Sequence, residues 1–388
     1  MLQLKNKILY VINADWYFEL HWLERAVFFK DIGYEVHIVM PVNEPEILKK
    51  LEELGFCITV LLIERTSMSI FNEIKVLISL HKLIKTVNPD IIHSVTIKPN
   101  LYSTILCRLN NIPLVSTYPG LGTLGVSKDF KYVLSRKVIF CLIKTFSKKQ
   151  NNVALFENEE DLQLFEDMKV IPRNRLIRVF GAGINLDSFS FSNIKTGNVS
   201  SLTLLFASRL LKNKGLSLLF ESVKQINNQG FNVRLKIAGI FDFDSPFAYT
   251  QDEVEEMASF DFVDWLGKRN DIKELITGAD VVCLPTTYGE GVPRILIEAC
   301  AVGRPIITTP LGGCKDICID NYNGLLVDPD SVESITKALE KLLLNNELKS
   351  GLGKNGRKLV EDKFSNHSVF EQHREIYLTQ LSGAKESG

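Results

Sequence analysis

Short, continuous apolar runs recur along this chain of 388 residues, at intervals that leave room for a helix between them. Within a run the apolar residues do not alternate with polar ones, as they would in a strand with one face in water. Strands that are apolar on both faces belong in a parallel sheet covered by helices on both sides. The runs predict strands at residues 8–12, 35–40, 57–62, 91–93, 114–117, 153–156 and 177–180, then at 202–207, 233–238, 263–266, 281–284, 305–308 and 324–327.

These strands form two groups, so the predicted fold class is α/β with two doubly wound domains. One core rarely supports a chain this long, and the 45% apolar content is enough to bury two. The polar stretch 190–201 predicts a linker, with the boundary near residue 195. Open parallel sheets bind ligands beyond the carboxyl ends of their strands, so two facing sheets would define an interdomain cleft.

Composition excludes several classes of protein. The seven cysteines are an odd number without paired C-x-x-C sets or a nearby histidine cluster, which predicts a reducing compartment and no structural zinc. No apolar run reaches the roughly 18 residues of a membrane span, and the first run is too short for a signal peptide. The net charge is -1 and neither half is strongly basic, which argues against nucleic acid. A cytoplasmic protein is expected.

Residues 128–149 account for most of the excess of positive over negative charge in the first half, and apolar residues separate the cations. This pattern is typical of a basic amphipathic helix on an anionic membrane surface. It is equally typical of an internal helix with a solvated basic face, so both interpretations stay open. The segment has one acid, Asp129, and its cations are Lys128, Lys131, Arg136, Lys137, Lys144, Lys148 and Lys149.

Two glutamates, Glu290 and Glu298, bracket the segment YGEGVPRILIEA at residues 288–299. A helix beginning near Pro293 would place Glu298 in its second turn and leave Glu290 beside the helix N-terminus, where unpaired N–H groups favour an anion. Gly291 leaves room for a ligand at the backbone, and Glu290 offers acceptors to sugar hydroxyls. Without further context, the ordinary interpretation is a solvated loop glutamate before a common helix.

Arg209 and Lys214 directly follow the predicted strand 202–207, five residues apart on one turn. That spacing lets both side chains reach one anion, and a departing diphosphate needs such cations. A lysine-rich surface turn is the alternative, because exposed Lys and Arg are common.

The order of motifs around these residues resembles the retaining GT-B glycosyltransferases with an E-x7-E motif, glycosyltransferase family 4. The resemblance covers most of residues 180–365. It implies two Rossmann-like domains facing across a cleft: an acceptor domain at 1–195, a nucleotide-sugar domain at 196–365, and a C-terminal helix at 366–388 that can cross back to the first. The motifs are FASRL leading to KG (206–215), IAG (237–239), VDWLG (263–267), ADVVCLP (279–285), the glutamate segment, GRPII (303–307), GG (312–313) and NGLLV (323–327).

The resemblance also implies roles for single residues. Glu290 would contact the hydroxyls of the donor sugar and Glu298 those of the ribose, while Arg209 and Lys214 would hold the diphosphate. Glu290, Arg209 and Lys214 form the expected catalytic set. The other donor-side residues that the resemblance implies are Gly291, Val292 and Pro293, which approach sugar and phosphate through the backbone, and Gly267, near the base.

The first domain matches the family less closely. Many members carry a histidine after the strand at 114–117, but none occurs here, which puts its donor-sugar contact in doubt. The segments HSVTIKPN (93–100) and STYPGLGT (116–123) look like members that act on polyprenyl-diphosphate-linked sugars. They contribute Lys98, which would meet the acceptor diphosphate unless it is an ordinary exposed loop lysine, and Gly120.

The expected reaction moves a hexose or N-acetylhexosamine from a UDP-sugar to a polyprenyl-diphosphate-linked saccharide, with retention, in assembly of a bacterial surface polysaccharide such as O-antigen or capsule. The partners are then a nucleotide sugar, a lipid-linked acceptor and the inner face of an anionic membrane. Asp242 and Asp244 lack further hard ligands nearby, so neither a metal nor another cofactor is expected. Two alternatives remain: a sugar-nucleotide epimerase of the same architecture, and a non-catalytic sugar-nucleotide-binding subunit.

Overall fold

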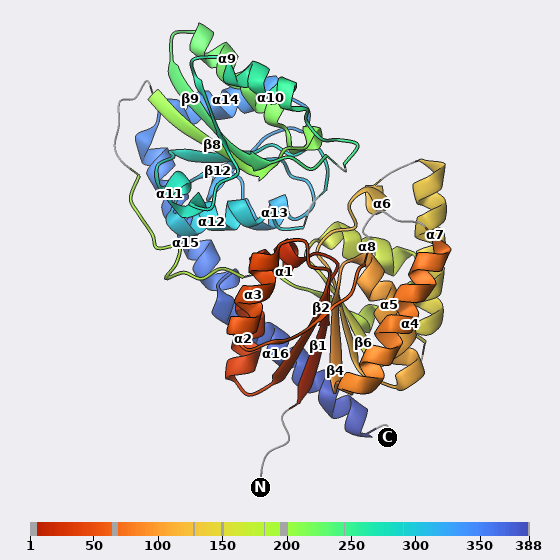
Figure 1. Cartoon of the computed structure of the whole chain (residues 1–388). Coiled ribbons are helices and arrows are strands. Elements are labelled where there is room, and N and C mark those ends of the chain that lie inside the picture. The colour runs from red at the N-terminus through yellow and green to blue at the C-terminus, as the bar shows by residue number, and fades with distance from the viewer. Residues whose placement is uncertain are drawn as a thin grey trace. The chain divides into compact units, whose positions relative to one another are not determined.

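The computed structural model describes residues 6–63, 69–126, 129–148, 151–181, 183–194, 201–243, 245–289 and 291–386 (Figure 1). These residues form two compact units. Residues 1–182 and 369–388 make up the first unit, and residues 183–368 make up the second. The boundary predicted near residue 195 falls on residues 195–200, which lie outside the described ranges.

The first unit contains a sheet of seven parallel strands in the order β3-β2-β1-β4-β5-β6-β7. Strand β1 pairs with β2 and β4, so that Ile8 lies opposite Val36 on one side and Ile91 on the other. All seven strands predicted for this half are confirmed. They are β1 (Lys7–Val11), β2 (Glu35–Met40), β3 (Cys57–Val60), β4 (Ile91–Val95), β5 (Leu114–Tyr118), β6 (Asn152–Phe156) and β7 (Leu176–Arg178).

Helices cover both faces of this sheet, which explains the apolar runs without alternation (Figure 1). Tyr10 packs with one helical layer, whereas its neighbours Leu9 and Val11 pack with the other. One layer consists of α1 (Asp15–His21), α2 (Leu23–Asp31), α3 (Pro45–Glu53) and α16 (Asn366–Glu386). The other consists of α4 (Ile70–Val87), α5 (Ile97–Asn110), α7 (Phe130–Phe146) and α8 (Glu159–Asp167), with the short α6 (Thr123–Val126) and η1 (Arg173–Arg175) nearby in sequence.

The C-terminal helix α16 is anchored in the first unit by a buried polar cluster. The hydroxyl of Tyr377 lies 3.1 Å from that of Tyr10 and hydrogen-bonds Nδ1 of His93. The other ring nitrogen of His93 lies 2.7 Å from Oγ1 of Thr117. His93 is therefore a satisfied core residue, because both ring nitrogens have a partner. Burial lowers the pKa of His93 well below its ordinary value, which keeps the imidazole neutral.

The second unit contains a six-stranded parallel sheet in the order β10-β9-β8-β11-β12-β13. All six predicted strands are confirmed: β8 (Ser201–Arg209), β9 (Asn232–Ile240), β10 (Val263–Gly267), β11 (Val281–Leu284), β12 (Ile306–Thr308) and β13 (Gly324–Leu326). Helix α9 packs against α14, and α12 packs against α15. The helices are η2 (Lys212–Lys214), α9 (Leu216–Asn228), α10 (Gln251–Ala258), α11 (Ile272–Thr277), α12 (Arg294–Val302), α13 (Cys314–Ile317), α14 (Val332–Leu343) and α15 (Asn346–Lys363).

The anchoring of α16 predicts a large loss of stability in Tyr377→Ala. Truncation removes a fully buried ring and leaves Nδ1 of His93 without its partner, so we expect the free energy of unfolding to fall by about 3–5 kcal/mol. Leu378→Ala is the matched control, because its exposed neighbouring side chain should contribute less than about 0.5 kcal/mol. Urea unfolding followed by circular dichroism measures both, and similar losses in the two variants would contradict the anchoring.

Candidate functional site

The order of strands in the second unit places a crevice between β8 and β11. From β8 the chain continues to β9 and β10 on one side, and the later strands β11, β12 and β13 lie on the other. Neighbouring parallel strands whose connections run in opposite directions leave a ligand-binding crevice at their carboxyl ends. Arg209 is the last residue of β8, and residues 285–289 follow β11. The two motifs singled out in the sequence therefore meet at this crevice.

Backbone contacts hold the two loops together. The carbonyl oxygen of Asn213 accepts hydrogen bonds from the amide of Thr287 at 2.9 Å and from Oγ1 of Thr286 at 3.1 Å. Gly215 has a left-handed backbone with φ of +81°, and a Cβ there would lie 2.0 Å from the carbonyl oxygen of Pro285. Only glycine allows such an approach, so Gly215 fixes the basic turn against the loop that follows β11.

Lys214 is brought to the glutamate segment by this contact. Its side chain is only 7% exposed, and Nζ lies 5.2 Å from the centre of the Tyr288 ring. An ammonium group at this distance from an aromatic face is in cation–π range. Lys214 is therefore a held cation rather than the solvated surface lysine of the alternative interpretation. Glu290 lies outside the described residues, so its role stays a prediction.

Arg209, at the end of β8 just before this turn, has a carboxylate partner. Its Nη1 is 2.6 Å from Oδ2 of Asp242, which follows β9. The sequence suggested Asp242 only as a weak metal ligand, because the pairing of β8 with β9 that brings it to Arg209 is not visible in a motif. Asp244 lies outside the described residues, and within the described ranges no three His, Cys, Asp or Glu residues are placed to hold a metal ion.

Residues 291–293 lead into α12 as predicted, and Pro293 is the N-cap residue of this helix. A Cβ on Gly313 would lie 2.5 Å from the carbonyl carbon of Gly291 and 2.5 Å from the amide nitrogen of Val292, so the two backbones are in direct contact. This contact fixes the path of the loop beside the helix N-terminus. Backbone N–H groups without helical partners favour an anion at such a place.

Glu298 lies in the second turn of α12 and is buried. Its Oε1 accepts a hydrogen bond of 2.8 Å from Nε of Arg294, one turn earlier. The i, i+4 spacing of these opposite charges is visible in the sequence, but the E-x7-E motif gives Arg294 no role. Arg294 orients the carboxylate that the family resemblance assigns to the ribose.

Gly267 ends β10, two strands away from β8. Aromatic side chains that follow β9 lie between these strand ends: Phe241 stacks on Phe243 with ring centres 5.1 Å apart and lies 6.0 Å from Trp265. Gly267 has a left-handed backbone with φ of +67°, and no atom lies within 4 Å of a Cβ built there. The structure therefore leaves space at Gly267, while contact with a base stays a prediction.

The two predicted residues of the first unit lie near the carboxyl ends of adjacent strands, Lys98 after β4 and Gly120 after β5. Lys98 is not the exposed loop lysine of the alternative interpretation. It lies in the first turn of α5, and its Nζ is 2.7 Å from Oε1 of Glu73 on α4. This helix begins at Ile97, directly before Lys98.

Backbone strain lies next to Lys98. Thr96 has φ of +75° and ψ of 165°, a conformation that costs a non-glycine residue about 1–3 kcal/mol. Its amide donates to the carbonyl oxygen of Thr117, which also accepts from Nδ2 of Asn100. The buried hydroxyls of Thr96 and Ser116 have no hydrogen-bond partner among the described residues. Strain and unsatisfied hydroxyls are features of ligand-binding edges.

Family models match both halves of the chain. Residues 190–359 match the model described as Glycosyl transferases group 1, and residues 7–158 match the one described as Glycosyl transferase 4-like. The first match includes every described candidate residue of the second unit. The second includes both candidate residues of the first unit.

Two relatives with specific enzyme names match most of the chain. One is the N,N'-diacetylbacillosaminyl-diphospho-undecaprenol alpha-1,3-N-acetylgalactosaminyltransferase of Campylobacter jejuni, 28% identical over 342 residues, which are 84% of this chain and 86% of the relative. The other is the UDP-Gal:alpha-D-GlcNAc-diphosphoundecaprenol alpha-1,3-galactosyltransferase of Escherichia coli, 24% identical over 328 residues, which are 81% of this chain and 82% of the relative.

Solved structures show the same fold. A glycosyltransferase from Rickettsia africae matches with a TM-score of 0.77 at 20% identity, over 98% of this chain and 99% of that one. Anabaena HepE, solved with UDP and glucose, matches with a TM-score of 0.77 at 16% identity, over 96% of this chain and 100% of that one. The two units thus have the GT-B architecture that the sequence predicted.

The contact between Gly215 and Pro285 predicts that Gly215→Ala lowers the free energy of unfolding by more than the strain of a left-handed backbone alone. Gly230→Ala is the matched control, because Gly230 has φ of +92° but no atom within 4 Å of a Cβ. We expect Gly230→Ala to cost about 1–2 kcal/mol and Gly215→Ala to cost about 1–3 kcal/mol more, since the turn must move. Equal losses in denaturant unfolding would contradict the close approach.

Proposed function

Because residues 7–158 belong to the glycosyl transferase 4-like family and residues 190–359 to the group 1 glycosyl transferases, the chain is a glycosyltransferase, and we propose its substrates and mechanism. The donor is a UDP-linked hexose or N-acetylhexosamine. The acceptor is a saccharide on a polyprenyl diphosphate, and the product retains the anomeric configuration of the donor. The reaction serves assembly of a bacterial surface polysaccharide.

The names of the relatives support this acceptor. Both the Campylobacter and the Escherichia enzymes carry an undecaprenol diphosphate sugar in their names, and each forms an alpha-1,3 bond. The Escherichia enzyme is also named for a UDP-sugar donor. A relative from Staphylococcus aureus, 26% identical over 91% of this chain, is named for capsular polysaccharide biosynthesis. Lys98 and Gly120, beside the strained Thr96, are the proposed acceptor side.

The observation that carries the proposed chemistry is the position of Lys214. The turn that ends β8 and the loop that follows β11 are joined by hydrogen bonds, so a buried ammonium group stands beside Tyr288 at the start of the glutamate segment. Negative charge develops on the β-phosphate as the donor bond breaks, and a pre-positioned cation stabilises it. Arg209 supplies a second cation, whose direction Asp242 fixes.

The proposed step needs no enzymatic nucleophile. The bond between the anomeric carbon and the β-phosphate oxygen breaks, and its electron pair leaves with UDP. The acceptor hydroxyl forms the new bond on the same face of the sugar, and its proton passes to the departing phosphate oxygen. Glu290 holds the sugar hydroxyls and Glu298 holds the ribose, which places the reacting atoms without removing a proton from them.

Lys214→Met tests this assignment. Loss of the buried cation should lower the rate of transfer about 100- to 1,000-fold, the usual effect of removing one group that stabilises developing charge. Lys212→Met is the matched control, because Lys212 lies two residues away but is exposed and pairs with Glu253 at 2.7 Å. The assay measures transfer from UDP-sugars to synthetic polyprenyl-diphosphate saccharides. A folded Lys214→Met enzyme with undiminished transfer would rule out the proposed role.

Contact with an anionic membrane is a further part of the proposal, and α7 supports it. This helix packs Phe140 and Ile143 into the core, while Phe130, Leu134 and Val138 on its outer side are 79%, 50% and 51% exposed. These three side chains recur every four residues, next to the exposed lysines Lys131 and Lys137.

Helix α4, in the same layer as α7, adds a second exposed apolar row, formed by Phe71, Ile74 and Ile78 (Figure 1). A solvated basic face, the other interpretation of residues 128–149, does not explain exposed phenylalanines on both helices. Within the described residues, none of the helices has the length and apolar character needed to span a bilayer. The proposed contact is therefore one in which the helices lie on the surface of the bilayer.

A double variant, Phe130→Ser with Leu134→Ser, should reduce binding to phosphatidylglycerol vesicles at least about tenfold, because it removes two exposed apolar anchors. Phe243→Ser is the control, since Phe243 is 71% exposed in the second unit and lies outside α7. Co-sedimentation with vesicles measures both. An equal loss of binding in the double variant and in Phe243→Ser, or no loss in either, would contradict a role for α7.

A further inference from the structure

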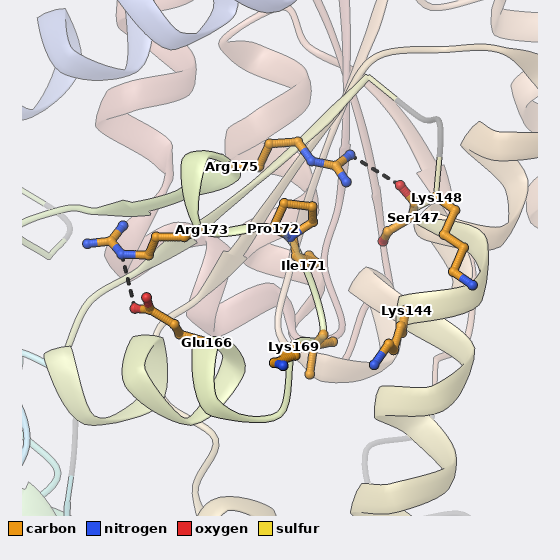
Figure 2. A pocket seen from close by; sticks show the side chains of 10 residues that line it. Lys144, Ser147, Lys148, Glu166, Lys169, Ile171, Pro172, Arg173 and Arg175 are labelled. Carbon is orange, nitrogen blue, oxygen red and sulfur yellow. Dashed lines mark hydrogen bonds and ion pairs between the residues drawn. The ribbon is translucent and has the colours of Figure 1, made fainter.

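A cavity of about 420 Å³ lies in the first unit between the C-terminal end of α7 and residues 169–175 (Figure 2). Its lining residues come directly before β6 and β7, so it lies at the amino edge of the parallel sheet. The proposed acceptor residues Lys98 and Gly120 follow β4 and β5 and therefore lie at the opposite, carboxyl edge. The cavity is thus separate from the acceptor side of the proposed transfer site.

Positive charge dominates the lining. Five of its ten residues are Lys or Arg and one is an acid, Glu166, whose Oε2 lies 3.0 Å from Nε of Arg173. Three further lining cations, Lys144, Lys148 and Lys169, are exposed, and within the described ranges no carboxylate lies in ion-pair distance of them. Figure 2 shows Arg173 turned toward Glu166, with Lys169 on the opposite side of the hollow from Lys144 and Lys148. These three lysines surround a wall that includes the buried Val170 and Ile171.

Arg175 crosses one end of the cavity and is fixed there. Its Nη1 donates to the carbonyl oxygen of Ser147 at 3.1 Å (Figure 2). It also donates to Oδ1 of Asn152. Ser147 is itself buried and its Oγ lies 3.1 Å from Nδ2 of Asn152. The guanidinium is therefore oriented by the start of β6, and its position does not depend on a ligand.

Lys169 has a backbone conformation that its side chain disfavours. It lies two residues after the end of α8 and has φ of +49°. Its amide donates to the carbonyl oxygen of Glu166, and the amide of Val170 donates to the carbonyl oxygen of Phe165. Glycine usually occupies this place after a helix, because a left-handed backbone does not strain it. The helix dipoles account for cations near the ends of α7 and α8. They do not account for a lysine where glycine would fit better.

We propose that this cavity binds the phosphate group of an anionic ligand, with Lys144, Lys148, Lys169 and Arg175 as its cationic partners. The apolar wall favours a phosphate that carries hydrocarbon, as in a lipid headgroup, over free phosphate. Phosphate binding in this cavity involves no transfer of sugar, so this proposal does not rest on the proposed transferase reaction.

Calorimetric titration of the full chain tests the proposal with three probes: sub-micellar dihexanoyl phosphatidate, inorganic phosphate and dihexanoyl phosphatidylcholine. We expect phosphatidate to bind and phosphatidylcholine to bind at least tenfold more weakly. Lys169→Gly and Lys144→Gln should each weaken phosphatidate at least tenfold, and Lys137→Gln, on α7 but outside the lining, should not. Lys169→Gly should not lower the unfolding midpoint, because glycine relieves the left-handed strain.

Phosphatidate binding tighter than phosphate identifies a lipid headgroup, and equal affinities identify a free phosphate; both support the site. Absence of binding by either anion, equal binding of phosphatidylcholine, or affinities unchanged in both lining variants would overturn it. Sugar transfer to a soluble short-chain acceptor, measured in the same variants, is expected to stay unchanged. Failure of the cavity therefore does not count against the transferase, and failure of transfer does not count against the cavity.

Discussion

Close contact between the backbones of Gly215 and Pro285 is the constraint on which the functional site depends. Parallel pairing of β8 with β11 brings their carboxyl ends to one edge, but pairing alone would leave the following loops free to diverge. The glycine and the hydrogen bonds to Asn213 join them. As a result, Lys214 is held beside Tyr288 although 74 positions separate the two residues in the sequence, and a cation is in place before any donor binds.

Much of the fold could be predicted from the sequence because its signal is local. Strands buried on both faces need apolar residues at every position, so each of the thirteen runs marked a strand whatever its neighbours were. The start of α12 followed from Pro293 for the same reason, since proline suits the entry of a helix. The division between α1 and α2 has no such local signal: α1 begins at Asp15, and the buried Trp22 separates the two helices with a non-helical backbone.

The site was only partly predictable, because its partners depend on contacts distant in sequence. Arg209 with Asp242 and Lys98 with Glu73 each join residues on different elements, and no spacing rule relates them. Arg294 and Glu298 have the i, i+4 spacing of an ion pair in the sequence, but the motif itself gives Arg294 no role. The left-handed Lys169 gives no signal in the sequence at all, since only backbone geometry distinguishes it from other surface lysines.

A crystal structure with bound UDP tests the central claim most directly. The account predicts that a pyrophosphate oxygen lies about 3 Å from Nζ of Lys214, with the diphosphate against the backbone of residues 291–293 and the ribose at Glu298. A nucleotide bound away from the carboxyl ends of β8 and β11, with Lys214 still facing Tyr288 and making no contact with phosphate, would contradict it.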